Sequence, residues 1–177
     1  GSKSVAMGIV GGSGGQLIEK TLGDMGITTD FVKVESETRV NMKIIDTKNR
    51  CNTDINEQGA AVTADVLAEV EKKLAEQIKP GDTVVLAGSV PKGAPADIYG
   101  RLVRLCNAHE ALAILDVDGA LMAPGLAAKP YLIKPNRQEF CDLLGYTPTD
   151  YVMEAINFYN STGIEILLTL GKKGAVY

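Results

Sequence analysis

Three residues close together in the sequence have types that occur in phosphate-binding sites: Lys134, Asn136 and Glu139. Asn136 and Glu139 stand three residues apart, directly after Pro135, so both face the same side of the first turn of a predicted helix. Two interpretations remain open on this spacing: a polar pair that holds a hydrated Mg²⁺ beside phosphates, or a capping box that closes the helix N-terminus. Lys134 is a cation at the carboxyl end of a predicted strand, which favours the phosphate interpretation.

A second group of polar residues recurs with a period of two. Three polar side chains alternate with three apolar ones, Arg39, Asn41 and Lys43 with Val40, Met42 and Ile44. A β-strand with this alternation presents the polar side chains on one face and the apolar side chains on the other. We predict a small antiparallel flap over residues 31–55. Two interpretations remain open: the flap is a lid whose cationic face covers a polar or anionic ligand, or that face is an ordinary solvent-facing surface.

Loops that contain glycine and serine give weaker signals. Ser89 follows a predicted buried strand, where its hydroxyl and the nearby amides could bind an anion or simply complete a turn. The run 11–15 (GGSGG) lacks the third glycine of the dinucleotide fingerprint, because Leu17 stands there, and no Lys-Ser or Lys-Thr pair follows as in a P-loop. We therefore interpret the run as a tight strand-to-helix turn, and a dinucleotide-binding oxidoreductase is disfavoured.

Strands and helices that alternate along the chain must position these residues. The apolar runs that predict buried strands cover residues 5–10, 83–87, 112–117, 131–134 and 165–170. Apolar residues at helical spacing lie between them, a pattern typical of a parallel sheet covered by helices on both faces. Ligands of such sheets bind outside the carboxyl ends of the strands. The loops expected to form the site begin at Gly11, Gly88, Asp116, Lys134 and Gly171.

Composition argues against several classes of protein. A net charge of −4 and a pI of about 5.1 argue against binding to nucleic acid or to an anionic membrane. No stretch reaches the roughly 18 apolar residues of a membrane span. Three cysteines without CxxC spacing disfavour a disulfide framework and a zinc site, and one histidine leaves little for histidine-based hydrolysis. Free thiols and no visible leader sequence predict a cytoplasmic protein.

Five segments, taken in order, resemble the ribokinase-like (PfkB) carbohydrate kinases, and most closely their phosphosugar branch of 1-phosphofructokinases and tagatose-6-phosphate kinases. The matching segments are GIVGGSGGQLIEKTLGDMGI, TRVNMKI, LAGSVPKG, LIKPNRQEF and LLTLGKKGAV. Each motif is weak alone, but five in this order and spacing are specific. The resemblance implies an α/β fold with a ribokinase-like parallel sheet sandwiched by helices. Residues 1–30 and 56–177 would form its core, and residues 31–55 a small antiparallel β lid.

The resemblance also implies an activity, in which the γ-phosphoryl group of ATP is transferred, with Mg²⁺, to a phosphorylated sugar. The expected acceptor is fructose 1-phosphate, which would become fructose 1,6-bisphosphate; tagatose 6-phosphate or another sugar is the alternative. The implied substrate-binding residues are Arg39, Asn41, Lys43 and Ser89. The implied nucleotide-binding residues are Lys134, Asn136, Thr169, Gly171 and Gly174, and the implied Mg²⁺ ligands are Asn136 and Glu139. Lids of this family often pair, which implies a homodimer through the lid.

The chain also departs from the family pattern. It lacks the LNPAxD-like opening, whose Asp grips sugar hydroxyls, the GGKGxN-like segment, and the GAGD motif that carries the catalytic Asp. We therefore expect that the chain is an internal piece of a longer kinase, that the piece contains no catalytic residue, and that it is inactive alone. A non-catalytic binding or structural module with the kinase fold is the alternative of another class.

Overall fold

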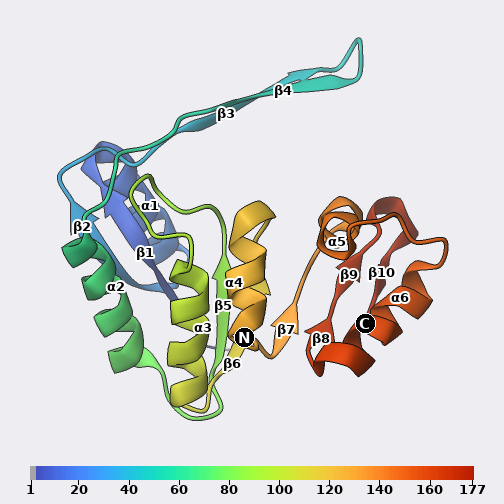
Figure 1. The fold of residues 1–177 in the computed structure, drawn as a ribbon. Coiled ribbons are helices and arrows are strands. Elements are labelled where there is room, and N and C mark those ends of the chain that lie inside the picture. The colour runs from blue at the N-terminus through green and yellow to red at the C-terminus, as the bar shows by residue number, and fades with distance from the viewer. Residues whose placement is uncertain (1–2) are drawn as a thin grey trace. The chain divides into compact units, whose positions relative to one another are not determined.

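Strands alternate with helices through residues 3–177, the part of the chain that the computed structural model describes (Figure 1). The chain divides into two units. The first runs to Glu76 and includes Val90–Ala94, and the second consists of Gln77–Ser89 and Pro95–Tyr177. Parallel strand pairs occur in both units, which confirms the predicted α/β class.

The first unit begins with a strand–helix–strand motif. Its elements are β1 (Val5–Gly11), α1 (Gly12–Asp24) and β2 (Thr28–Val34), and α2 (Ala64–Gln77) follows later in the chain. β1 and β2 pair in parallel along their whole length, and α1 makes the connection between them. Gly12 starts α1 with φ +61°, a left-handed conformation that glycine adopts without the steric cost of a Cβ. The glycine run therefore forms the tight strand-to-helix turn that was predicted.

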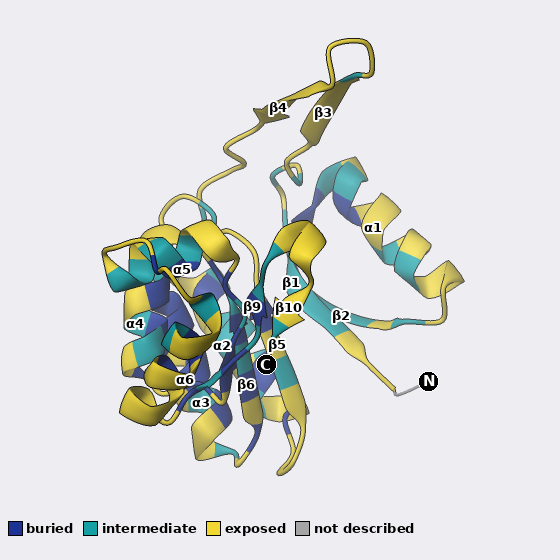
Figure 2. Ribbon diagram, turned by 90° about the vertical axis from the view of Figure 1, so that its right-hand side faces the viewer, coloured by how far each residue is buried: buried dark blue, intermediate teal, exposed yellow. Residues whose placement is uncertain are grey.

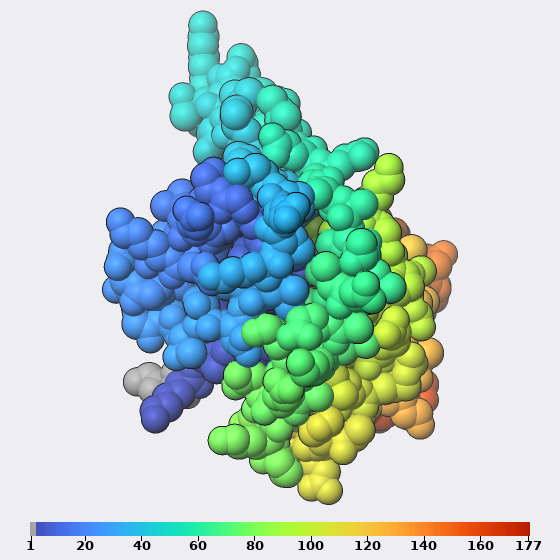
Figure 3. Space-filling view, turned by 90° about the vertical axis from the view of Figure 1, so that its left-hand side faces the viewer, coloured from blue at the N-terminus to red at the C-terminus, as the bar shows by residue number. Residues whose placement is uncertain are grey.

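An antiparallel hairpin lies between β2 and α2 in the sequence. Its strands are β3 (Asn41–Asp46) and β4 (Cys51–Asn56). Every strand residue except Asp46 is exposed (Figure 2), and the hairpin stands out as a narrow arm from the rest of its unit (Figure 3). The hairpin is shorter than the predicted flap, because residues 31–34 belong to β2. Val32 is buried there, and the segment pairs in parallel with β1.

The second unit is built on a four-stranded parallel sheet with the order β5-β6-β7-β8. Its strands are β5 (Thr83–Ala87), β6 (Leu112–Asp116), β7 (Leu132–Ile133) and β8 (Glu165–Ile166), and β9 (Leu168–Thr169) and β10 (Ala175–Val176) form a separate antiparallel pair. Its helices are α3 (Ile98–Ala108), α4 (Met122–Ala127), α5 (Arg137–Leu144) and α6 (Tyr151–Thr162), with 3-10 turns at Gly119–Leu121 and Gly171–Lys173. None of the helices in residues 3–177 has the length and apolar character needed to cross a bilayer.

The core of the second unit is apolar. Its fully buried side chains include Val103, Leu115, Ile133, Phe140 and Leu168. The Phe140 ring of α5 meets the Phe158 ring of α6 edge to face, with the ring centroids 6.2 Å apart. Within the described part of the chain, the Tyr99 hydroxyl is a polar group on a buried residue, and two backbone carbonyls accept its hydrogen bonds.

The three free cysteines differ in exposure, which gives a first testable expectation. Cys51 is exposed on β4, whereas Cys106 is buried in α3 and burial raises the pKa of its thiol to about 11. Since the thiolate is the reactive form, a thiol reagent at about pH 8 should label Cys51 rapidly in the folded chain and Cys106 only after denaturation. Mass spectrometry of labelled peptides measures both, and Cys51→Ser should remove the fast phase. Rapid labelling of Cys106 in the folded chain would contradict this expectation.

Candidate functional site

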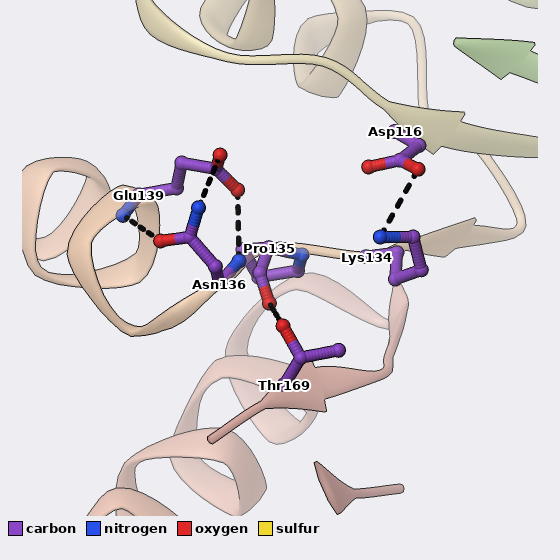
Figure 4. A network of polar contacts seen from close by, with 6 residues as sticks. All are labelled: Asp116, Lys134, Pro135, Asn136, Glu139 and Thr169. Carbon is purple, nitrogen blue, oxygen red and sulfur yellow. Dashed lines mark hydrogen bonds and ion pairs between the residues drawn. The ribbon is translucent and has the colours of Figure 1, made fainter. Parts of the chain in front are cut away.

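Two charged side chains meet at the carboxyl end of the parallel sheet in the second unit (Figure 4). Asp116 ends β6, and Lys134 directly follows β7, its neighbour in the sheet. The backbone N–H of Lys134 donates to the carbonyl of Leu115 at 3.0 Å, which brings the two side chains out at the same edge. Lys134 Nζ lies 3.0 Å from Asp116 Oδ2. Each side chain remains more than a third exposed, so the ion pair itself stabilises the fold little and the ammonium group is accessible to a ligand.

Asn136 and Glu139 form a capping box at the start of α5. Asn136 Oδ1 accepts hydrogen bonds from the backbone N–H groups of Gln138 at 2.8 Å and Glu139 at 3.0 Å. In return Glu139 Oε2 accepts from the backbone N–H of Asn136 at 2.8 Å, and the Asn136 amide donates to Glu139 Oε1 (Figure 4). The structure therefore has the capping geometry that was one of the two interpretations of this spacing.

Of the two side chains, the Glu139 carboxylate has the donor atoms that fit a hydrated magnesium ion. Mg²⁺ keeps several waters in protein sites and is bound through one or two carboxylates together with substrate phosphates. Each carboxylate oxygen of Glu139 accepts one hydrogen bond from Asn136 and keeps lone pairs for an ion, whereas the N–H groups of Gln138 and Glu139 use both lone pairs of Asn136 Oδ1. Within residues 3–177 no cluster of three or more acidic, cysteine or histidine side chains gathers as a metal site. The donor set suits an ion shared with phosphates and does not suit an ion enclosed by protein alone.

An open hollow of about 600 Å³ adjoins the capping box. Its lining residues are Asn136, Arg137, Gln138, Thr169, Leu170, Gly171 and Gly174. They come from two segments distant in sequence, the N-terminus of α5 and the turn between β9 and β10. Four of the residues assigned by resemblance to the nucleotide are thus brought together in one place.

Hydrogen bonds hold the two sides of the hollow in register. The backbone N–H of Thr169 donates to the carbonyl of Pro135 at 3.0 Å, and the Thr169 hydroxyl lies 3.4 Å from the same oxygen. The turn is closed by the N–H of Leu170, which donates to the carbonyl of Gly174 at 2.8 Å. Gly171 and Gly174 both have positive φ, a conformation that glycine adopts readily because it has no Cβ.

Arg137 lines the hollow and was not singled out from the sequence. Its guanidinium lies 4.9 Å from the centre of the Tyr151 ring, and Nη2 donates to the Tyr151 hydroxyl at 3.4 Å. A cation held against an aromatic face loses less conformational freedom when it binds an anion. Its position between the two residues of the capping box could have drawn attention to Arg137 in the sequence. Its partner Tyr151 lies on α6, so spacing alone could not indicate that contact.

The predicted lid residues belong to the hairpin of the first unit. Asn41 and Lys43 lie on one face of β3, and Lys43 Nζ is 3.4 Å from Asp54 Oδ1 on the opposite strand. Arg39 precedes the strand, and its side chain passes close to Gly59. The apolar face of the hairpin pairs Met42 with Ile55, both about half exposed.

Ser89 lies in the exposed loop after β5, in the second unit. The start of this loop is held by the Tyr99 hydroxyl, which lies 2.9 Å from the carbonyl of Ala87 and 2.8 Å from that of Gly88. Burial raises the pKa of Tyr99, so the hydroxyl stays protonated and able to donate over the ordinary pH range. The Tyr99 hydroxyl therefore holds the first residues of the loop that carries Ser89 in place at the carboxyl end of β5.

Comparison with known proteins identifies the family. The model of the pfkB family of carbohydrate kinases matches residues 1–177. A 1-phosphofructokinase of Bacillus subtilis is 35% identical over 88% of this chain, and a tagatose-6-phosphate kinase of Staphylococcus epidermidis is 34% identical over 99% of it. The chain spans 50% and 58% of these two relatives.

A solved structure agrees with this assignment. The phosphofructokinase-2 of Escherichia coli in complex with fructose-6-phosphate superposes with a TM-score of 0.89 at 26% identity. The match covers 99% of this chain and 59% of that one. Together with the family match over the whole sequence, this likeness confirms the ribokinase-like fold expected from the five motifs. The chain belongs to the pfkB family of carbohydrate kinases.

Proposed function

We propose that the protein to which this chain belongs transfers a phosphoryl group from ATP to a sugar phosphate. The observation that carries the proposal is the hollow at the N-terminus of α5, because four residues assigned to the nucleotide line it in a chain that belongs to a kinase family. Relatives named 1-phosphofructokinase and tagatose-6-phosphate kinase support a phosphorylated acceptor. The free thiols fit the reducing cytoplasm as the place of action.

On the nucleotide side, the proposed roles follow from charge and access. Lys134 places an accessible cation at the carboxyl end of the sheet, where it can meet phosphate oxygens. The hollow is lined on one side by Thr169, Gly171 and Gly174. Because two of these residues have no side chain, a planar or phosphorylated ligand can approach the backbone closely. Glu139 would hold Mg²⁺, and Asn136 would join it once its side-chain oxygen leaves the capping hydrogen bonds. A bound Mg²⁺ supplies neutralisation of the phosphate charge.

On the sugar side, we propose that Arg39, Asn41 and Lys43 contact the sugar and its existing phosphate, with Ser89 as a further phosphate ligand. Two cations and an amide within five residues give donors of the kind that bind phosphate. Such transfer depends mainly on positioning and on neutralising charge, so binding residues on several loops are consistent with it. The exposed apolar face of the hairpin supports pairing of two copies through this arm.

The acceptor is tested with a panel of sugar phosphates in a coupled ADP-release assay on the full-length protein. We propose fructose 1-phosphate as the acceptor, since the 1-phosphofructokinase of Bacillus subtilis is 35% identical. Its kcat/KM should exceed that of tagatose 6-phosphate and fructose 6-phosphate. A higher kcat/KM for tagatose 6-phosphate would replace this acceptor by the alternative, and no turnover with any sugar phosphate would favour a non-catalytic module.

Replacement of Arg39 by alanine tests the lid in the same protein. Loss of a charge-assisted hydrogen bond should weaken sugar-phosphate binding by about 1.5–3 kcal/mol and raise its KM accordingly. The KM for ATP should stay unchanged. Lys48→Ala removes a cation from the turn of the same hairpin and serves as the control, with no expected change in either KM. An unaltered sugar-phosphate KM in the Arg39 variant would remove Arg39 from the site.

A further inference from the structure

The carboxylate of Glu37 caps the helix α1, which begins 25 residues earlier, at Gly12. Glu37 Oε1 accepts from the backbone N–H of Ser13 at 3.1 Å, and Oε2 accepts from that of Gly14 at 3.3 Å. The Ser13 hydroxyl lies within 3.4 Å of both oxygens. The first N–H groups of a helix lack partners within the helix, and α1 has no acidic residue in its first turn and only glycine at its N-cap. Glu37 supplies the missing acceptor.

Thr38 binds the residue just before that helix. Its Oγ1 accepts from the backbone N–H of Gly11 at 2.9 Å and lies 3.0 Å from the Gly11 carbonyl. The backbone N–H of Thr38 donates to the same carbonyl at 3.0 Å. The end of β1 and the start of α1 are therefore both tied to the segment that leaves β2.

The glycine run has the shape that these contacts require. A Cβ at Gly12 would lie 2.2 Å from the carboxylate oxygens of Glu37, and a Cβ at Gly11 would lie 2.1 Å from the carbonyl oxygen of Ser36. Both distances are far below a normal contact, so residues 36–38 occupy the space that side chains would otherwise take. The glycine run therefore makes a tight turn and also forms the surface against which residues 36–38 pack.

Arg39 comes immediately after the two contacts, and a third contact lies on its other side. The backbone N–H of Val40 donates to Glu57 Oε2 at 2.8 Å. The backbone that carries Arg39 is therefore held at residues 37, 38 and 40, directly before the exposed strands of the hairpin begin. Nothing comparable fixes the tip of the hairpin to the rest of the unit among the described contacts.

We propose that Glu37 and Thr38 anchor the base of the hairpin to the N-terminus of α1 and so position Arg39 for the sugar phosphate. Glu37 is a positioning residue in this proposal, because its carboxylate is engaged by α1 and acts on the substrate only through the backbone of Arg39. The inference rests on the proposed role of Arg39 in substrate binding. The hydrogen bond from the Ser13 backbone is the largest cause that lowers the pKa of Glu37, which keeps the anchor charged at neutral pH.

The test compares Glu37→Ala with Glu35→Gln in the full-length protein. Glu35 is an exposed carboxylate two residues earlier in the same segment. Glu37→Ala should raise the KM for the sugar phosphate about tenfold or more while the KM for ATP stays unchanged, because misplacement of a binding group is costly. Glu35→Gln should leave both values at the wild-type level. An unchanged sugar-phosphate KM in a folded Glu37→Ala protein overturns the proposal.

Threonine 38 gives a second pair of variants should the glutamate variant fold poorly. Thr38→Val keeps the shape and removes the hydroxyl, and Thr38→Ser restores the hydroxyl without the methyl group. The proposal expects a raised sugar-phosphate KM in the valine variant and rescue by serine. Hydrogen exchange gives a readout independent of activity: the amides of Ser13, Gly14 and residues 36–40 should exchange faster in Thr38→Val and Glu37→Ala than in wild type.

The Arg39→Ala protein separates failure of the anchor from failure of the proposed function. If Arg39→Ala raises the KM and Glu37→Ala does not, the anchor is wrong and the role of Arg39 stands. If Arg39→Ala has no effect, the role of Arg39 is wrong, whatever Glu37 does. With both proposals correct, Glu37→Ala should add little to the KM already raised by Arg39→Ala, because the two changes act on one interaction.

Discussion

The 177-residue chain, purified alone, is expected to release no ADP above a no-enzyme control with fructose 1-phosphate, tagatose 6-phosphate or fructose 6-phosphate. The acceptor hydroxyl needs a base as the new P–O bond forms, and the charge that develops on the transferred group needs fixed donors. In the family that the sequence resembles, the GAGD motif supplies both, and this motif is not among the 177 residues.

No other residue is an obvious substitute for the base. Asp116 and Asp118 lie at the carboxyl end of another strand, β6. The imidazole Nδ1 of His109 lies 2.9 Å from the carbonyl of Leu105 at the end of α3, within its own helix. Lys134, Asn136 and the turn at Thr169 remain available to a nucleotide, so weak ATP binding without turnover is the expected behaviour.

A coupled ADP assay on the purified chain decides the matter, with the full-length protein as the positive control. Circular dichroism should first establish that the chain is folded, since an unfolded sample would be inactive for another reason. Calorimetric titration with ATP then measures the weak binding. Sugar-dependent ADP release by the chain alone would mean that a catalytic base lies within residues 1–177.

Local patterns in the sequence predicted most of the elements. The apolar run 83–87 became β5. The alternating segment was correct in part, because Asn41 to Ile44 lie in the exposed strand β3 but Arg39 and Val40 precede it. The beginning of the flap was wrong, because residues 31–34 lack a helical period and yet lie in β2, where Val32 is buried. Absence of a helical pattern does not distinguish a core strand from an exposed one.

Contacts between distant residues could not be predicted in the same way. The carboxylate of Glu37 binds Ser13, 24 positions earlier in the sequence, and Arg137 binds Tyr151, 14 positions later. No periodic pattern in the sequence indicates either contact. The capping box, in contrast, lies within four consecutive residues and was one of two interpretations of its spacing. Sequence patterns therefore indicate contacts between residues close in the chain and miss contacts that packing makes between distant segments.

Replacement of Glu139 by glutamine is expected to separate the two roles of the capping box. Glutamine is accepted at the N3 position of a capping box, and one side-chain oxygen can still accept from the backbone N–H of Asn136. The free energy of unfolding should therefore change by no more than about 1 kcal/mol. If Glu139 organises Mg²⁺, activity of the full-length protein should fall about 10–100-fold at low Mg²⁺ and recover partly as Mg²⁺ is raised.

The matched control is Asp150→Asn, at the N-cap of α6 in the same unit. Asp150 Oδ1 accepts from the backbone N–H groups of Val152 at 2.9 Å and Met153 at 3.1 Å, so this change also removes one charge from a helix cap. Asp150 is not among the residues that line the hollow. The Mg²⁺ dependence of ADP release should therefore remain at the wild-type level in Asp150→Asn and shift to higher concentration only in Glu139→Gln. A wild-type Mg²⁺ dependence in Glu139→Gln would limit Glu139 to capping α5, because loss of the charge would then have no effect beyond the helix.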